Sequence, residues 1–383
     1  MRRASGAKRW CLGAAAAGLG ASAAALAFGR AERFWLSWVF WFLYAATVGL
    51  GALALVAIEH VANARWSVPL RRAAERIGGL VVFAAPLALV SLFSLPVLYE
   101  WARPEAVAEN PLLAKKSAWL NVPFFSTRAV ACAALWIFSH RALVGGSILQ
   151  DRTKDPALTV RARRFAPAFL AILAATLTIL AFDWVSSLEP EWYSDVFGVY
   201  LFAGSFLAGL AATALAVLWL RSRGRLPGVR FDHLYNLGGF LFAFTVFWSY
   251  IAFAQYMLIW YANIPEEVFW YAERVGGSWR PVALALALVH FAIPFFALVT
   301  RDAKGDPRRL GWVAALVLAA HALDLYWLLF PSLGVGPVFG WEEASVALFF
   351  LGAGFGWVSR EMRRGEDMPV GDPFLAEGLE FRL

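Results

Sequence analysis

The sequence is poor in charged residues and in the side chains that usually hold redox cofactors. Charged residues make up 16% of the 383 residues and hydrophobic residues 61%, whereas a soluble domain is about 45–50% apolar. The two cysteines, Cys11 and Cys132, are too few for a disulfide framework or a cysteine-ligated cluster. No apolar stretch holds two of the five histidines, although paired bilayer-spanning haems normally take two from each of two helices. The sequence therefore predicts no haem, iron or other metal bound by this chain.

Signatures of common soluble enzymes are missing as well. The chain has no CxxCH, no phosphate-binding P-loop and no Rossmann glycine pattern, and nothing in it is typical of a nucleophile paired with a base. A net charge of +7 would favour nucleic-acid binding in a soluble protein. Here the charges lie in short connections between apolar stretches, so they predict orientation in a lipid bilayer and no nucleic-acid partner.

Apolar runs long enough to cross a bilayer, about 20 residues each, recur along the whole chain. The sequence thus predicts an all-α integral membrane protein with about ten transmembrane helices. The expected spans lie near residues 10–28, 36–62, 77–99, 126–148, 165–188, 196–220, 237–261, 282–300, 310–330 and 344–359.

Basic residues alternate between the two sides of these spans. Of the 34 Lys and Arg, 25 lie before the first span, after the last one or in every second connection, and seven lie in the intervening connections. Cytoplasmic loops carry the excess of Lys and Arg in multi-pass proteins. We therefore expect both termini to be cytoplasmic.

The two ends of the chain differ from its middle. Basic residues before the alanine-rich run at 10–28 are also typical of a signal peptide. The run is longer than a usual signal core and no clear cleavage site follows, so we expect a retained transmembrane helix within residues 1–30. Residues 31–359 then form the polytopic membrane domain. Residues 360–383 are polar with little periodicity and predict an extended cytoplasmic arm.

Ionisable and amide side chains at membrane depth are the candidate functional groups. Charged groups there cost about 2.5–3.5 kcal/mol on insertion scales and usually face a bundle interior or a water-filled cavity. Their spread over both halves of the membrane is typical of a proton path, and the alternative is a set of paired structural groups. The candidates for the path are Asp183, Gln255 and Asp324 in the outer half, His321 one turn from Asp324, and Glu59 and His140 toward the inner side.

Gln255 lies about two turns inside the outer end of the seventh span. An amide left unpaired in hydrocarbon costs several kcal/mol, so we expect this helix inside a bundle, against other polar helices. Counted at about 1.5 Å per residue, Asp183, Gln255 and Asp324 lie at comparable outer depth. We expect these three side chains to approach one another.

The outer connections are acidic and aromatic, as in Glu189-Pro190-Glu191-Trp192-Tyr193 and in Pro265-Glu266-Glu267 followed by Trp270-Tyr271. Trp and Tyr commonly anchor a protein at the membrane interface; the alternative is a docking face for an extracytoplasmic partner. In the last span, Gly352 and Gly356 form a GxxxG pattern that favours close helix packing.

Three segments resemble one family of respiratory membrane subunits. The first is Phe182-Asp183-Trp184 continuing through Ser187-Leu188-Glu189-Pro190 and Trp192-Tyr193-Ser194 to Phe197-Gly198-Val199-Tyr200. The second is Gln255-Tyr256-Met257-Leu258-Ile259-Trp260-Tyr261-Ala262-Asn263-Ile264-Pro265-Glu266-Glu267, and the third is Leu323-Asp324-Leu325-Tyr326 with Pro331. Together they resemble the F subunit of bacterial alternative complex III, a quinol:electron-acceptor oxidoreductase. The resemblance covers most of the chain from the second span to the ninth.

The resemblance implies a polysulfide-reductase membrane-subunit (NrfD-like) fold, with two four-helix bundles and flanking helices, in the bacterial inner membrane. It implies five kinds of partner: a related polytopic C subunit, an iron–sulfur subunit, multihaem and monohaem cytochrome c subunits, and a small membrane-anchored subunit. Haem c and iron–sulfur clusters would then belong to the partners. The family's quinol site lies in the C subunit and none of its residues carries over, so quinone contact by this chain stays open.

A role in assembly and proton translocation follows from the resemblance, with Asp183, Gln255 and Asp324 carried over as a proton path. The alanine-rich first span and the pairing of His321 with Asp324 are not assigned to the family pattern. The alternative class is a free-standing secondary transporter. Such a protein should show corresponding broken helices in its two halves, and the sequence shows no such pair.

Overall fold

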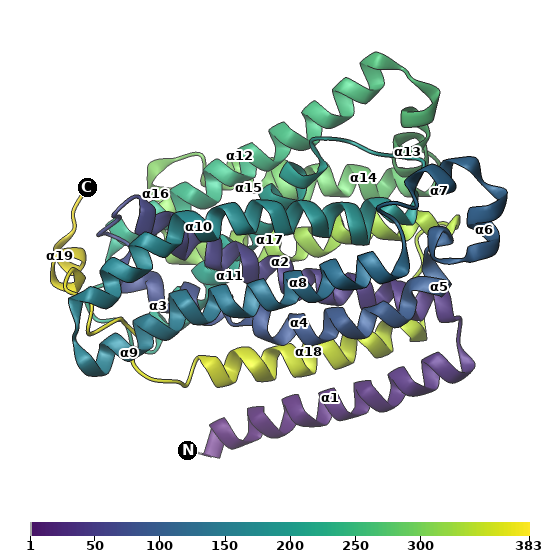
Figure 1. Cartoon of the computed structure of the whole chain (residues 1–383). Coiled ribbons are helices and arrows are strands. Elements are labelled where there is room, and N and C mark those ends of the chain that lie inside the picture. The colour runs from purple at the N-terminus through teal and green to yellow at the C-terminus, as the bar shows by residue number, and fades with distance from the viewer. Residues whose placement is uncertain (1) are drawn as a thin grey trace.

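The computed structural model describes residues 2–383, with side chains from residue 9 onward, and these residues contain helices and connections but no strand. The chain is an all-α integral membrane protein. Nine helical segments within the described residues are long and apolar enough to cross a membrane. A tenth long helix, α18 (Trp341–Glu361), is less apolar and packs along α1 (Arg2–Phe28), as Figure 1 shows. The predicted ten helices are thus all present.

Most helix ends differ from the predicted span ends by a few residues, because the helices continue past the apolar core into the connections. The remaining α-helices are α2 (Ala31–Val61), α3 (Val68–Gly78), α4 (Leu80–Val90), α5 (Leu95–Leu98), α6 (Pro104–Glu109), α7 (Pro111–Lys116), α8 (Val122–His140), α9 (Gly146–Thr153), α10 (Pro156–Leu180), α11 (Phe197–Ser222), α12 (Phe231–Ala262), α13 (Pro265–Val275), α14 (Arg280–Leu286), α15 (Ile293–Leu298), α16 (Arg301–Gly305), α17 (Pro307–Leu329) and α19 (Leu375–Glu380). Three π-helical segments interrupt spans: η3 (Arg141–Gly145), η4 (Ala181–Val185) and η7 (Ala287–Ala292).

Two of the inner connections end in an aspartate followed by proline, which starts the next helix. The Asp155 carboxylate accepts a hydrogen bond from the Ala157 N–H at 2.9 Å, and the Asp306 carboxylate accepts one from the Arg308 N–H at 3.0 Å. Each carboxylate thereby satisfies one of the free N–H groups of a first helical turn. Proline at the following position has the backbone angle that a helix requires. These caps fix where α10 and α17 begin.

The long helices form two four-helix groups. The first bundle contains α2, α4, α8 and α10, and the second contains α11, α12, the α14–η7–α15 span and α17. Helices α2 and α11 meet at the centre, where a Cβ added to Gly51 would lie 1.8 Å from the Ser205 carbonyl oxygen. Only glycine allows this backbone-to-backbone contact. Helices α1 and α18 flank the bundles and touch equally closely, since a Cβ on Gly352 would lie 2.5 Å from the Ala15 nitrogen.

Both ends of the chain lie at the same end of the molecule, which also carries most of the basic connections and is called the inner end below (Figure 1). Helices α6, α7 and α13 lie at the opposite, outer end (Figure 1). The outer connections pack against one another: the Trp192 and Trp270 rings stack at 4.2 Å, and both side chains are buried. These two indoles therefore join the outer connections to each other and do not anchor in headgroups.

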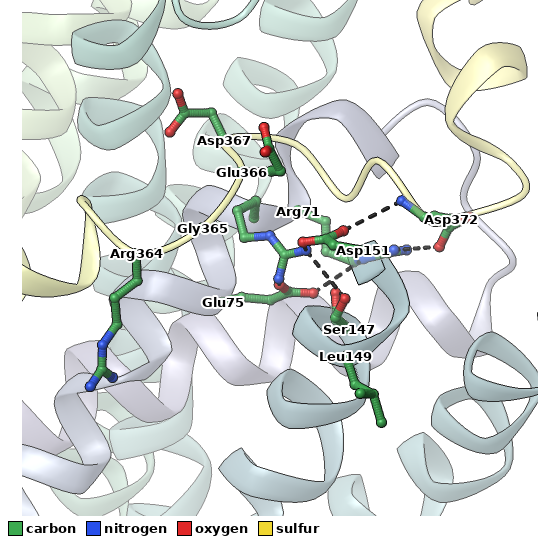
Figure 2. A network of polar contacts seen from close by, with 12 residues as sticks. Arg71, Glu75, Ser147, Leu149, Asp151, Arg364, Gly365, Glu366, Asp367 and Asp372 are labelled. Carbon is green, nitrogen blue, oxygen red and sulfur yellow. Dashed lines mark hydrogen bonds and ion pairs between the residues drawn. The ribbon is translucent and has the colours of Figure 1, made fainter. Parts of the chain in front are cut away.

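Residues 362–383 form a docked strap across the inner end, and not the extended arm that the sequence predicts. Figure 2 shows Asp372 of this segment joined to Arg71 of α3. The ion pairs join Arg71 with Asp372 and Arg76 with Asp367 (2.8 Å), and beside them Arg72 pairs with Glu75 (2.7 Å) and Asp151 (2.5 Å). All three arginine side chains are buried. A polar segment without periodicity is ordered here because its carboxylates compensate a cluster of buried guanidinium groups.

Candidate functional site

A buried carboxyl group, Asp324, lies at the centre of the second bundle on α17. One oxygen accepts a hydrogen bond from the Tyr200 hydroxyl of α11, and the other accepts one from the Trp248 indole N–H of α12 at 3.3 Å. The side chain is 2% exposed. Among the described residues no cation lies within ion-pair distance of it. A carboxyl with neutral donors alone is free to exchange a proton, unlike one half of a fixed ion pair.

His321 lies one turn before Asp324 on the same face of α17, as the sequence predicts. Its Nε2 is 2.9 Å from the Thr47 hydroxyl at the middle of α2, and its Nδ1 has no hydrogen-bond partner among residues 9–383. Both side chains pack against Gly204 of α11, since a Cβ there would lie 3.4 Å from the imidazole and 3.6 Å from a carboxyl oxygen of Asp324. Two titratable groups thus lie side by side against α11.

A second histidine, which lies near the middle of the eighth apolar run, belongs to this cluster. His290 is carried by the π-helical segment η7, and its ring lies 3.9 Å from the Trp248 ring, centroid to centroid. The imidazole is fully buried, and neither of its nitrogens has a hydrogen-bond partner in the described part of the chain. π-helical turns inside α-helices often occur at functional sites. Asp324, His321, His290, Tyr200 and Trp248 are called the carboxyl cluster below.

Asp183 has a different environment, in the first bundle on η4. Its two oxygens accept hydrogen bonds from the Arg128 guanidinium of α8 at 2.7 and 3.0 Å, and the Trp119 indole N–H adds a third at 3.1 Å. Both charged side chains are buried. Paired, two-point contacts of this kind are strong and fix geometry. Asp183 therefore joins α8, η4 and the outer connection.

The expectation that Asp183, Gln255 and Asp324 form one group is wrong as to hydrogen bonding. Each carboxyl is bonded to its own set of partners, and no hydrogen bond joins any two of the three among the described residues. Gln255 is buried on α12 as expected, but its carbonyl oxygen has no partner in the part of the chain that the structure covers. Comparable depth along the spans does not by itself bring these side chains together.

The two inner candidates lie near the strap. Glu59 is buried at the inner end of α2, and one of its carboxyl oxygens has no hydrogen-bond partner within the described residues. His140 ends α8 directly before η3 and is half-buried. Neither contacts the carboxyl cluster: Thr47 and Glu59 are twelve positions apart on α2, about 18 Å at 1.5 Å per residue.

A pocket of about 490 Å³ opens beside the carboxyl cluster and shares two of its residues, Tyr200 and Trp248. Its other walls come from α12, α13, the α14–η7 span and α17. Two members of the carboxyl cluster therefore form part of the pocket wall.

Comparison with protein-family models and with curated proteins gives no match for this chain. Function is therefore inferred from the residues and from their geometry.

Proposed function

We propose that this chain is a multi-pass subunit of a respiratory quinol:electron-acceptor oxidoreductase of the alternative complex III type, in the bacterial inner membrane with both termini cytoplasmic. In it the chain contributes to assembly and to proton translocation. Its partners are the related polytopic C subunit, the iron–sulfur subunit, the two cytochrome c subunits and the small anchored subunit. These partners carry the haem c and the iron–sulfur clusters.

The observation that carries the proton role is the uncompensated Asp324 carboxyl in the bundle interior, with His321 and His290 close to it. Buried polar groups are normally hydrogen-bonded, as Asp324 is to Tyr200 and Trp248, and ionisable groups inside a membrane often mark proton or ion pathways. A purely structural Asp324 would be expected to have a cation, as Asp183 has in Arg128.

Two of the three segments that carry the resemblance, the first and the third, meet in space. Tyr200 of the first segment donates a hydrogen bond to Asp324 of the third. Glu189 of the first pairs at 2.6 Å with Arg274, whose guanidinium also donates to the Leu328 carbonyl beside the third segment. Segments far apart in the sequence thus build one outer region around the carboxyl cluster.

Purification from native membranes tests the partner assignment, because cytochrome c subunits should co-purify with the chain. The proton role is tested by Asp324→Asn, which keeps the shape of the side chain but removes its titration. We expect the variant complex to assemble and to oxidise quinol. In reconstituted vesicles, the number of protons released per electron should fall to the number that quinol oxidation itself releases.

Glu380→Gln is the control, because Glu380 is an exposed carboxylate of α19 outside the bundles. This variant should keep the full proton yield. An Asp324→Asn complex with an unchanged yield would show that Asp324 carries no translocated proton. A chain that purifies alone, without cytochrome subunits, would instead favour the free-standing transporter.

A further inference from the structure

A second cavity, of about 280 Å³, lies at the outer end of the molecule, between α7 with the connection after it and the outer end of the span that contains α10 and η4. Its wall includes Lys115, Lys116, Trp119, Phe182 and Trp192, and it is called the lysine pocket below. It shares no wall residue with the pocket beside the carboxyl cluster. Its volume is below the roughly 300–1,000 Å³ of sites for whole small molecules, so it has room for a small polar group.

The lysine pocket carries positive charge without a counter-ion. Among residues 9–383, no carboxylate lies within ion-pair distance of Lys115 or Lys116. The Lys116 ammonium group is half-buried and donates a hydrogen bond to the Pro190 carbonyl. Burial lowers the pKa of Lys116, and the charge of the exposed Glu191 offsets this only in part. The two ammonium groups therefore attract an anion from outside the chain.

The only carboxylate bonded to the pocket wall within the described residues is already compensated. Asp183 accepts a hydrogen bond from the Trp119 indole, and both of its oxygens also accept from Arg128. Its negative charge is therefore paired with the guanidinium and does not neutralise the lysines.

A buried donor in the same wall has no acceptor. Trp192 is 1% exposed, and its indole nitrogen has no hydrogen-bond partner in the described part of the chain. Buried polar groups are normally hydrogen-bonded. The pocket thus offers an N–H and two ammonium groups, which suit a ligand made of acceptor oxygens. Lysine commonly binds phosphate as a point charge, and the free oxygens of a phosphate diester accept hydrogen bonds and carry negative charge.

The lysine pocket lies where two spans reach their outer ends. The span that contains α10 and η4 ends at Leu188, and the span that contains α8 begins at Val122. Trp119 and Tyr193 of the pocket wall are 45% and 58% exposed, as is typical of the headgroup level of a membrane. Val122 and Phe124 are exposed as well. They continue an apolar surface from the pocket toward the bilayer, which acyl chains could follow and a free phosphate ion would not use.

We propose that the lysine pocket binds the phosphate group of a membrane phospholipid. The phosphate oxygens would accept hydrogen bonds from Lys115, Lys116 and the Trp192 indole. Because Trp192 is buried, the phosphate has to enter the pocket to reach this donor, while the acyl chains lie outside along the start of α8. The proposal goes beyond the proposed function and does not depend on it, since lipid binding requires neither partner subunits nor proton movement.

Photolabelling of the full chain in dodecyl maltoside micelles, which contain no phosphate, tests the site. The probe is phosphatidylglycerol with a diazirine near the glycerol end of one acyl chain, and labelled peptides are identified by mass spectrometry. Label should appear within residues 115–124 or 182–193. Excess unlabelled phosphatidylglycerol should remove this label. Excess dioleoylglycerol, which has acyl chains but no phosphate, should not.

A double variant, Lys115→Gln with Lys116→Gln, removes both charges and keeps two polar side chains. It should weaken binding of the probe about tenfold, roughly the loss of one good contact. Arg103→Gln is the matched control, because Arg103 is an exposed cation of the same outer connection that does not line the pocket. It should label like the native chain. Ala118→Trp places an indole in the pocket wall and serves as the blocked variant if the double variant does not fold.

Three results would overturn the proposal. The first is equal labelling of these peptides in the native chain and in the blocked variants. The second is protection by millimolar inorganic phosphate as complete as by phosphatidylglycerol, which would show a site for free phosphate. The third is a native complex in which these peptides are not labelled although the isolated chain is, which would assign the lysines to an acidic segment of a partner.

Discussion

The ion pair between Arg128 and Asp183 allows a sharp separation of structural from proton-carrying roles. Asp183→Asn leaves the buried Arg128 charge without its compensating carboxylate, and removing one partner of a buried pair costs about 3–5 kcal/mol. Two other contacts of Arg128 offset part of this cost. The guanidinium also donates to the Trp119 carbonyl at 3.0 Å and lies 4.2 Å from the Trp119 ring centre. We therefore expect Asp183→Asn to impair folding and assembly before it affects proton transfer.

A double-mutant cycle isolates the pair. Arg128→Gln should cost about as much as Asp183→Asn, and the double variant should be clearly less destabilised than the sum of the two. We expect a coupling energy of about 2–3 kcal/mol, at the upper end for residues in direct contact. Cys132 of α8 is a built-in reporter, since its thiol is buried in the native chain and becomes reactive when α8 separates.

The assay is titration with sodium dodecyl sulfate in mixed micelles, followed through modification of Cys132 by a thiol-reactive dye after Cys11→Ser. Leu135→Ala is the control, because this α8 side chain is partly exposed to lipid and should shift the transition little. An Asp183→Asn variant that unfolds with the native chain, yet loses proton translocation in the complex, would refute this account and return Asp183 to the proton path.

Three further expectations concern the inner end, the flanking helices and the topology. Asp372→Asn, which breaks the buried pair with Arg71, should release the strap to proteolysis, whereas Glu377→Gln should not, because its pair with Arg65 is exposed and worth about 0–1 kcal/mol. Gly356→Cys should form a disulfide with Cys11 on mild oxidation, since a Cβ there would lie 3.6 Å from the Cys11 Cβ; absence of the bond would mean that α1 is removed or does not pack on α18. A cysteine in the inner 222–225 turn should stay inaccessible to an impermeant reagent added from outside, as the basic connections predict, and labelling from outside would reverse the orientation.

The positions of the ten helices could be predicted because an apolar run of sufficient length determines a span regardless of its neighbours. The close contact of α1 with α18 also follows from a local pattern, the small residues around Gly352. Pairing across the bundle does not follow in this way. Arg128 and Asp183 are 55 positions apart. Counting residues along a span gives the depth of a side chain in the membrane but not the neighbouring helix that it faces. The sequence does hold one signal for this pairing. Arg128 lies inside an apolar span, and a buried cation there requires a carboxylate nearby.

The aromatic members of the carboxyl cluster could not be predicted for a different reason. Tyr200 and Trp248 lie in long apolar helices rich in Phe and Trp, where aromatic side chains at helical spacing are usually packing residues. Their polar ends become significant only when a carboxyl group from a third helix lies within reach. The strap is a similar case, since its order derives from the arginines of α3 and not from any pattern of its own.

The seam between α2 and α11 limits how a proton could cross this chain. From Asp324 the polar groups lead inward through His321 to Thr47, and the next inner candidate on α2 is Glu59, about 18 Å further along. In between, Gly51 and Gly209 bring the two helix backbones into direct contact, which leaves no space for a water chain at that seam. The seam therefore closes the direct route along α2 and α11 between Asp324 and Glu59 in this structure.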